Sequence, residues 1–470
     1  MLIIDGAERL DCATLLRRAT ALAQALLARM PAGSVVSFML PNWHEAAVIY
    51  LGATLAGMAV NPILPSLREH ELSYILADCG SRMIFIPGTF RGHDYPTMLD
   101  TVCAQLATPP DVVVVRGDQP WPSADVQTPL PVLDPDDVRM ILYTSGTTGA
   151  PKGVLHSHRS LGALIAQLHQ HWCIAPGDAF LVPSPIAHIG GSIYAFECPL
   201  LLGSTAILMD RWDADDAIAL MTRHHCTHMA GATPFLVGLL GAAERARTRL
   251  PDLKVFICGG ASVSPQLIRS ATKYFDGATV TRVYGSTELP VTTIGAPGDP
   301  DRAADTDGRP GIADVILVDG EIRAKGPQML LGYLHAEDNA FDDQGYFRTG
   351  DLGRLTEDGY LVVTGRAKDL IIRNGENISP KEIEDVLAGH PDITEVAIIG
   401  LPDDRTGERA VAVVVGAATV DVAALQRFLT DRGVAKFKMP EQVEIWDALP
   451  KNDAGKVLKH RIRTELAACQ

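Results

Sequence analysis

Short apolar runs alternate with helical patterns along the first 283 residues, and this alternation sets the expected fold class. Apolar residues recur at helical spacing over residues 12–30, which predicts an amphipathic helix that ends before Pro31. Residues 43–57 show a second helical pattern. Strands separated by helices form parallel sheets whose faces the helices cover. The expected strands are residues 34–40, 58–63, 83–86, 112–115, 141–143, 180–182, 206–209, 255–258 and 280–283.

The pattern changes after residue 314, where two antiparallel hairpins are expected. Asp319-Gly320 separates residues 315–318 from 321–324, and 357–359 separates another pair of short runs. A small β-barrel-like unit is therefore predicted over about 310–364. Because a chain of 470 residues is longer than a single hydrophobic core accommodates, two or more domains are expected.

A compact α+β domain is expected at the C-terminal end. Ser379-Pro380-Lys381-Glu382 has the form of a capping box with proline at the first helical position. Strands over 396–399 and 410–415 and a helix over 421–432 complete this domain. The segment 117–137 is rich in proline and aspartate and is predicted to be a surface loop. We therefore expect an α/β protein with a large N-terminal domain, residues 1–366, of two mixed or parallel sheets, flanking helices and the β unit, followed by a small domain, residues 367–470.

Charge and composition exclude several classes of function. A net charge of −15 argues against a general nucleic-acid or anionic-membrane binder, so an anionic nucleotide would need a local positive site. The longest nearly apolar stretch, 46–60, is shorter than a bilayer span of about 20 residues. The first residues lack the basic and apolar regions of a signal peptide. Eight cysteines without a Cys-x-x-Cys pair fit reduced thiols in the cytoplasm.

The segment from Tyr143 to Gly153, Tyr-Thr-Ser-Gly-Thr-Thr-Gly-Ala-Pro-Lys-Gly, follows one of the expected strands. Its glycines allow successive N–H groups to surround an anion, and its hydroxyls and Lys152 add donors and positive charge. Phosphate suits such a loop, although the lysine is not placed as in a Walker motif. A flexible Ser/Thr/Gly connector explains the segment equally simply, and taken alone it is favoured.

Five later stretches carry chemistry-bearing residues, and each has a purely structural alternative. His188 and Gly259 follow strands, where a structural histidine and a tight turn are the alternatives. Tyr284 lies where ligands bind in open α/β sheets and offers a ring for stacking, while Glu288 suits Mg²⁺. Asp351 suits ribose hydroxyls. The five stretches are residues 185–191, 256–261, 284–288, 346–353 and 449–456, the last of which could be a solvated tail.

Together and in this order, these motifs resemble the adenylate-forming superfamily of acyl-CoA synthetases, aryl-CoA ligases, luciferases and peptide-synthetase adenylation domains. The resemblance covers almost the whole chain and is carried by Tyr143–Gly153, Tyr-Gly-Ser-Thr-Glu at 284–288, Thr-Gly-Asp at 349–351, Gly-Arg-x-Lys-Asp at 365–369 and the late Gly455-Lys456. Residues 90–96 look like those of cyclohexanecarboxylate- and medium-chain-CoA ligases.

The resemblance implies a role for each matching residue. ATP binding is implied for Thr144, Ser145, Gly146, Thr147, Thr148, Lys152, Gly260, Ala261, Tyr284, Gly285, Ser286, Thr287, Asp351, Arg366 and Lys456. An acyl pocket is implied for Ala187, His188, Ser192, Ile193, Thr233, Gly259, Gly260 and Pro290. Catalytic roles are implied for Lys456, His188, Glu288 and Lys152, with Glu288 as the Mg²⁺ ligand. Lys368 is the implied hinge of a mobile C-terminal domain, and CoA binding is implied for Gly375, Glu376 and Asn377.

The implied activity is an AMP-forming acid:CoA ligase that uses ATP, Mg²⁺ and CoA. The segment after His188 has no acid for an α-ammonium group, which favours a plain hydrophobic carboxylic acid over an amino acid. Alternatives are a ligase that loads a carrier protein in trans and a non-catalytic nucleotide-binding homologue. A homodimer is common among relatives. Ala187 stands where an aromatic is usual, and 452–454 departs from the usual Thr or Ser.

Two smaller patterns are interpreted as structural. Residues 224–228, His-His-Cys-Thr-His, alternate along an expected strand and are not predicted to bind zinc. Glu197 and Cys198 are expected to serve packing, because no Cys–His nucleophile pair is evident.

Overall fold

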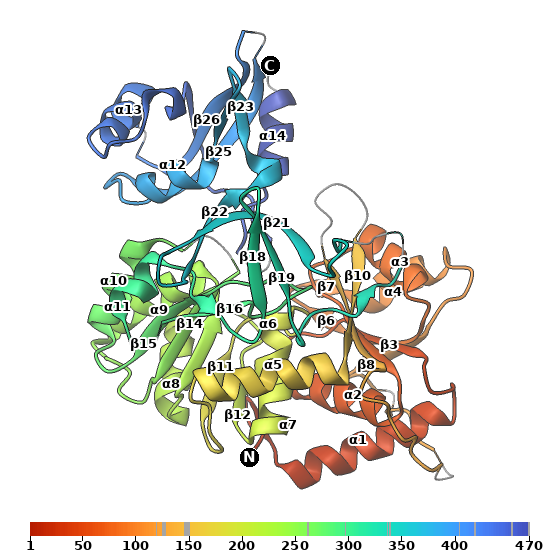
Figure 1. The fold of residues 1–470 in the computed structure, drawn as a ribbon. Coiled ribbons are helices and arrows are strands. Elements are labelled where there is room, and N and C mark those ends of the chain that lie inside the picture. Colours follow the sequence, from red (N-terminus) through yellow and green to blue (C-terminus); the bar gives the residue numbers. More distant parts are fainter. Residues whose placement is uncertain are drawn as a thin grey trace.

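The computed structural model describes all residues except 119, 125–127, 145–150, 261–262, 297, 336, 338–339, 404, 418–419, 453–454 and 469–470. Figure 1 shows a large body formed by the N-terminal two thirds of the chain and a smaller upper lobe formed by the C-terminal residues. None of the described helices is long and apolar enough to cross a membrane.

The first seven-stranded sheet has the order β15-β14-β13-β11-β12-β1-β2. From β15 to β1 all neighbours are parallel, and only β2 is antiparallel to its neighbour β1. The helices between its strands provide the crossovers that parallel pairing requires. The strands are β1 Ile3–Asp5, β2 Glu8–Leu10, β11 Ala179–Val182, β12 Thr205–Leu208, β13 His228–Gly231, β14 Val255–Gly259 and β15 Thr279–Val283.

The second seven-stranded sheet has the order β20-β10-β9-β4-β3-β5-β8. Its β4, β3, β5 and β8 are parallel, as the alternation predicts, whereas β10 turns back antiparallel to β9. The strands are β3 Val35–Phe38, β4 Ala59–Pro62, β5 Ser81–Pro87, β8 Asp111–Val115, β9 Val138–Thr144, β10 Lys152–Ser157 and β20 Gly332–Tyr333. The short strands β6 Thr89–Phe90 and β7 His93–Asp94 pair with each other, as do β16 Thr293–Ile294 and β17 Arg309–Pro310.

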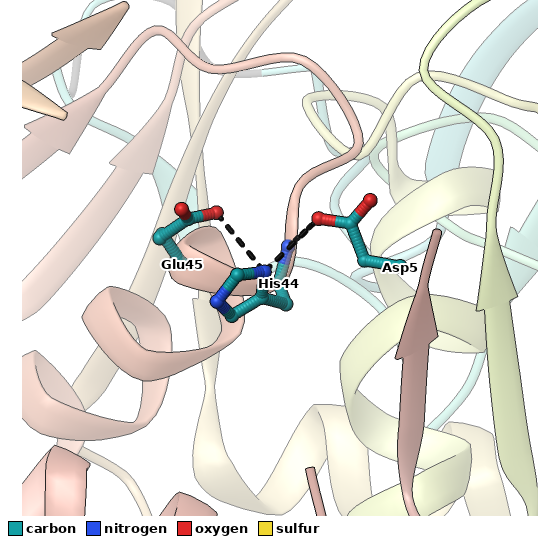
Figure 2. Close-up of side chains that lie close together, drawn as sticks. All are labelled: Asp5, His44 and Glu45. Atoms are coloured by element: carbon teal, nitrogen blue, oxygen red, sulfur yellow. Dashed lines mark hydrogen bonds and ion pairs between the residues drawn. The ribbon is translucent and has the colours of Figure 1, made fainter. Parts of the chain in front are cut away.

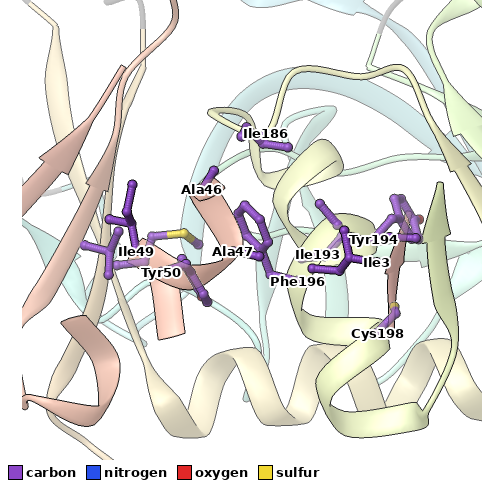
Figure 3. Packing of buried hydrophobic residues seen from close by; sticks show 14 of the residues in the cluster. Ile3, Ala46, Ala47, Ile49, Tyr50, Ile186, Ile193, Tyr194, Phe196 and Cys198 are labelled. Atoms are coloured by element: carbon purple, nitrogen blue, oxygen red, sulfur yellow. The ribbon is translucent and has the colours of Figure 1, made fainter. Parts of the chain in front are cut away.

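Helices that are apolar on all sides fill the space between these sheets. α2 buries nine of its residues, and the π-helical turn η1 is buried throughout. Tyr50 of α2 stacks on Phe196 of η1 with ring centroids 4.8 Å apart, and Figure 3 shows both within the same apolar cluster. The body helices are α1 Cys12–Leu27, α2 His44–Leu55, α3 Glu69–Asp78, α4 Tyr95–Cys103, α5 His158–His171, α6 Ile189–Ser192, η1 Ile193–Glu197, α7 Cys198–Leu202, α8 Ala214–His224, α9 Thr233–Ala246, α10 Pro265–Tyr274 and α11 Pro300–Asp305.

The predicted hairpins after residue 314 are present in a four-stranded antiparallel sheet. Its order is β18-β19-β21-β22, with bounds Asp314–Val318, Glu321–Lys325, Phe347–Leu355 and Leu361–Arg366. Asp319 and Gly320 both have positive φ, which matches the two-residue turn expected there. In Figure 1 this sheet lies between the body and the upper lobe.

The upper lobe packs helices against a five-stranded sheet built mainly on the long pair β25 Ile393–Asp403 and β26 Gly407–Gly416. Its other strands are β23 Ile371–Arg373, β24 Glu376–Ile378 and β27 Gln442–Ile445, and its helices are α12 Pro380–Leu387, α13 Val422–Thr430 and α14 Lys459–Ala468. The described residues of 117–137 contain no helix or strand, which confirms the predicted loop.

Two local predictions are wrong. Ser379 occupies the N-cap position of α12, but its side chain does not cap the helix; its Oγ donates to the Thr364 carbonyl at 2.5 Å. Residues 224–228 do not lie along one strand, because His224 ends α8, His225 caps it in a left-handed conformation, and only His228 enters β13. In each case a tertiary contact or a helix end overrides the local pattern.

A buried polar group ties η1 to the neighbouring elements. Glu197 accepts a hydrogen bond from Tyr50, and its Oε1 lies 3.0 Å from Nη2 of Arg139 on β9. Tyr50 and Glu197 are almost fully buried, and Arg139 is 8% exposed. Burial raises the pKa of the Tyr50 hydroxyl. A charge pair of this kind contributes little net stability, but losing one partner leaves an uncompensated buried charge.

Glu197→Gln is therefore expected to lower the free energy of unfolding by about 3 to 5 kcal/mol, because it strands the Arg139 guanidinium. The triple variant Tyr50→Phe, Arg139→Met, Glu197→Leu removes every polar member and should recover most of that loss. Urea denaturation followed by fluorescence measures both. Equal loss in the two variants would contradict this account.

Candidate nucleotide and acyl site

Four neighbouring parallel strands end at one edge of the first sheet, and most of the predicted site residues follow them. β11 leads to the segment with His188, β13 to Thr233 at the start of α9, β14 ends at Gly259, and β15 leads to Tyr284. Because the strands are parallel, their carboxyl ends lie side by side, where open α/β sheets bind ligands. The structure thus gathers residues that are far apart in the sequence.

Close backbone approaches explain several glycines at this edge. A Cβ on Gly259 would lie 2.4 Å from Cγ1 of Val283, and one on Gly285 would lie 2.6 Å from the backbone nitrogen of Val291. A Cβ on Gly191 would lie 2.1 Å from the Pro185 carbonyl oxygen, so the turn after β11 also requires glycine. Of the other predicted acyl-pocket residues, Ala187, Ser192, Ile193 and Pro290 are buried, and Gly260 has a φ of +80°.

Tyr284, Asp351 and Arg366 form one bonded cluster. The Tyr284 hydroxyl donates to Oδ2 of Asp351 at 2.9 Å, and Nε of Arg366 lies 2.8 Å from Oδ1 of the same carboxylate. Asp351 and Arg366 are directly opposed on β21 and β22, which fixes their pairing. Burial, reinforced by the Asp351 charge, raises the pKa of Tyr284, so its hydroxyl stays protonated and a donor at neutral pH.

Lys456 of the upper lobe reaches this cluster. Burial and the positive charge of Arg366 lower its pKa to about 8, while Asp351 acts in the opposite direction. Asn452 holds the turn: its Oδ1 accepts from the Lys456 backbone N–H, and its own N–H donates to the Lys456 carbonyl. A Cβ on Gly455 would lie 2.9 Å from Pro234 on α9, so this loop is docked against the body.

Lys152 and Glu288 both lie close to Tyr333. The Tyr333 hydroxyl donates to Oε1 of Glu288 at 3.1 Å, and Nζ of Lys152 is 5.4 Å from the centre of its ring. Thr144 pairs with Lys152 across β9 and β10. Glu288 has a second carboxylate oxygen with which to bind a hard cation such as Mg²⁺ beside a phosphate. The predicted phosphate-loop residues Ser145, Gly146, Thr147 and Thr148, and also Ala261, lie outside the described residues.

The predicted CoA-binding residues are not at this edge. Gly375, with a φ of +81°, turns the chain between β23 and β24, and Glu376 and Asn377 follow it on β24. Figure 1 shows β23 in the upper lobe, beyond β21 and β22. A cavity of about 510 Å³ beside this hairpin is lined by Arg373, Asn374, Glu376, Lys436 and Phe437. Lys368 lies in the short helix Ala367–Asp369 that joins the two parts, and burial lowers its pKa.

Asp5, His44 and Glu45 form the group of described residues that is close enough to hold a metal ion, as Figure 2 shows. Arg116 already bridges this group, because its guanidinium lies 2.7 Å from Asp5 and 2.6 Å from Glu45. Burial alone would raise the pKa of Asp5, but the hydrogen bonds from His44 and the Arg116 charge lower it. The guanidinium supplies the positive charge that a metal would bring, so we interpret the group as an ion-pair network.

Sequence reasoning missed two residues of the site. Tyr333 contacts Glu288, and His156 on β10 bonds the carbonyl of Thr287 at 2.7 Å. Strand periodicity places Lys152, Val154 and His156 on one face of β10, and this signal could have found His156. Tyr333 gives no comparable local signal, because β20 is two residues long.

Comparisons of this chain with family models, known proteins and solved structures agree on one family. The model for "AMP-binding enzyme" matches residues 1–334, and that for "AMP-binding enzyme C-terminal domain" matches residues 382–456. A medium-chain fatty-acid–CoA ligase of Escherichia coli is 33% identical, with 95% of this chain and 84% of the relative covered. A sulfoacetate–CoA ligase of Cupriavidus necator is 33% identical over 97% and 91%. The structure of ATP-bound MatB from Rhodopseudomonas palustris has a TM-score of 0.89 at 30% identity, covering 99% of this chain and 95% of that one.

Proposed function

Because the chain belongs to the AMP-binding enzyme family, we propose that it is an ATP-dependent, AMP-forming acid:CoA ligase. It adenylates a hydrophobic carboxylic acid, releases pyrophosphate and then transfers the acyl group to CoA. The observation that carries the proposal is the docking of Lys456 beside the Tyr284–Asp351–Arg366 cluster. That arrangement brings the positive charge of Lys456 to a site where Tyr284 and Asp351 suit the adenine and the ribose of ATP.

In the first half-reaction the acid's carboxylate attacks the α-phosphorus of ATP, and pyrophosphate leaves. The substrate itself is the nucleophile, so the protein must chiefly orient two anions and offset their repulsion. Tyr284 stacks on the adenine, and Asp351 accepts hydrogen bonds from the ribose hydroxyls. Lys152 and Lys456 supply positive charge from opposite sides, and Thr144 with the loop after it binds the phosphates. His188 and the residues after it line the acyl pocket.

Mg²⁺ is the expected metal, with Glu288 as its ligand. A carboxylate beside nucleotide phosphates is the donor set that Mg²⁺ prefers, and Tyr333 holds that carboxylate in place. When bound, the ion neutralises charge on the phosphate oxygens.

The second half-reaction needs a different face of the C-terminal part. We place the domain boundary at residues 366/367 and the pivot at Lys368. With Lys456 docked, the hairpin of Gly375, Glu376 and Asn377 lies away from the acyl site. Rotation about Lys368 withdraws Lys456 and brings that hairpin to the acyl-adenylate. The open depression of about 510 Å³ beside it is lined by Lys436, Phe437 and the acid Glu376, and by Arg373, which also pairs with Glu441; its cations and ring are the proposed partners of the phosphates and adenine of CoA.

The substrate is proposed to be a medium-sized apolar or alicyclic acid. Apart from His188, the predicted pocket residues are small, apolar or hydroxyl-bearing, and one of the similar proteins is named for medium-chain fatty acids. The second candidate is a ligase that loads a carrier protein. A similar protein named 2,3-dihydroxybenzoate–AMP ligase shows that the match extends beyond enzymes named for CoA. Offering free CoA and a purified carrier as competing thiols separates the two.

Localisation and assembly are part of the same proposal. Each cysteine in the described part of the chain is free, which suits a reducing cytoplasm. A homodimer is the proposed assembly, and sedimentation velocity measures it.

The decisive test follows AMP release over a panel of fatty, alicyclic and aromatic acids with CoA. Lys456→Ala is expected to abolish ATP–pyrophosphate exchange but to retain most thioester formation from a supplied acyl-adenylate, because its charge serves only the first half-reaction. Absence of exchange by the unchanged protein with every acid would refute the proposed function. Equal loss of both half-reactions in the variant would refute the division of roles.

The pH dependence of adenylation should follow Lys456. Because its pKa is lowered to about 8, the lysine loses its proton, and with it the needed charge, as the pH rises through this value. We expect kcat/KM for pyrophosphate exchange to fall above about pH 8. Lys456→Arg stays charged and should move that fall to higher pH at a lower plateau. An unchanged profile in this variant would assign the titration to another group.

Gly455→Ala tests the docking of the loop. The added Cβ would lie 2.9 Å from Pro234 and would also strain a φ of +79°. Gly433→Ala is the matched control, because Gly433 has a φ of +77° with open space around its Cβ position. We expect pyrophosphate exchange to fall at least tenfold in the first variant and to change less than twofold in the second. Similar losses would attribute the effect to backbone strain alone.

A further inference from the structure

β10 carries two polar side chains toward the nucleotide site, and the proposed mechanism uses only one of them. Lys152 begins the strand and His156 lies four residues later on the same face. Val154 between them packs in a cluster with Leu289 and Tyr284. This face of β10 is therefore turned toward the segment 284–289.

The tautomer of His156 follows from its partners. Nε2 lies 2.7 Å from the carbonyl oxygen of Thr287, and a carbonyl only accepts, so Nε2 carries the proton and donates. Nδ1 faces Oγ of Ser160 at 3.4 Å. Burial lowers the pKa of His156 to about 4, with the Thr287 bond opposing the shift. The ring is thus a neutral donor throughout the physiological pH range.

The Thr287 carbonyl belongs to the loop 284–288, which carries a predicted ligand-binding residue at each end. Tyr284 stands at one end of the loop and Glu288 at the other. The Glu288 carbonyl accepts from the Leu330 N–H at 2.8 Å, and its carboxylate accepts from Tyr333. The His156 bond spans 131 positions of sequence and joins the strand of Lys152 to the loop of Glu288.

We propose that His156 is a positioning residue for ATP: its Nε2–H holds the Thr287 carbonyl and so fixes the loop 284–288 relative to Lys152. The residue does not touch the nucleotide. It keeps the adenine-stacking tyrosine and the metal-binding glutamate in register with the phosphate-binding strand. The inference rests on the proposed function, because it takes ATP as the ligand of both segments.

His228 provides a matched control within the same chain. It is also fully buried, and its Nε2 donates to a backbone carbonyl, that of Trp172, at 2.9 Å. Burial lowers its pKa as well. It lies at the amino end of β13, opposite the edge that gathers the site. A merely structural buried histidine should therefore behave alike at both positions.

The experiment compares His156→Leu and His228→Leu with His156→Gln and His156→Asn. Binding of ATP is measured by calorimetry, and KM and kcat by pyrophosphate exchange. We expect His156→Leu to weaken ATP binding and to raise the KM for ATP by about tenfold, as loss of one positioning hydrogen bond implies. His228→Leu should lose thermal stability with less than a twofold change in that KM. The KM for the acid should stay near its original value in both.

The two amide variants keep the proposal falsifiable should the leucine variant fail to fold. The Gln amide nitrogen reaches the place of Nε2 and should restore most of the affinity for ATP. The Asn amide nitrogen takes the place of Nδ1 and should not. Equal affinity in Gln and Asn variants, or an equal KM change at His156 and His228, overturns the inference. Failure of the unchanged protein to exchange pyrophosphate would instead overturn the proposed function.

Discussion

The carboxylate of Asp351 is the contact on which the arrangement of the site depends. It accepts from Tyr284 on the main sheet's edge and pairs with Arg366 on the neighbouring strand, and its charge acts on Lys456 of the upper lobe. Three separate parts of the chain therefore meet at one acid. A carboxylate has about four acceptor sites, so ribose hydroxyls still find acceptors beside these partners. In the proposed mechanism the same group binds the nucleotide and interacts with the charge of the docked lysine.

Because the net charge of the chain is −15, an anionic nucleotide must be attracted by cationic side chains at the site itself. Lys152 lies on β10 of the body and Arg366 on β22 of the four-stranded sheet, whereas Lys456 belongs to the upper lobe and has a lowered pKa where it is docked. Burial and the nearby charge of Arg366 lower the pKa of Lys456, because placing a further cation in a partly buried and already positive site is unfavourable before an anion arrives. ATP and the acid supply the missing negative charge. Substrate binding and lysine docking should therefore favour each other, which links occupancy of the site to closure of the lobe.

The sheets could be predicted because buried parallel strands leave an unmistakable alternation, as at β3, α2 and β4. The family motifs could be predicted because each of them is a short continuous run of residues: Tyr284 to Glu288 is one loop, and Thr349 to Asp351 is one run within β21. Their bonding partners could not be assigned, although strand periodicity does indicate the face of β10 that carries His156. Tyr333 reaches Glu288, and His156 reaches Thr287, only through the register of β10 with β20 and the packing of the loop. Ser379 had a sound local signal, and a carbonyl across the hinge overrode it.

The hydrogen bond that Ser379 makes in place of the predicted cap is relevant to the proposed rotation. Ser379 follows the proposed pivot Lys368, while Thr364 precedes it, so their hydrogen bond connects the two sides of that pivot. Rotating about Lys368 would break the bond and leave the Thr364 carbonyl to water. Ser379, however, already occupies the N-cap position of α12, where a serine hydroxyl satisfies the free N–H groups of the first turn. In the proposed rotated orientation the hydroxyl would therefore find a new partner at the start of α12. The proposed rotation would thus exchange the Ser379–Thr364 hydrogen bond for a helix-capping bond of similar strength, and the cap is available because it is unused in this structure.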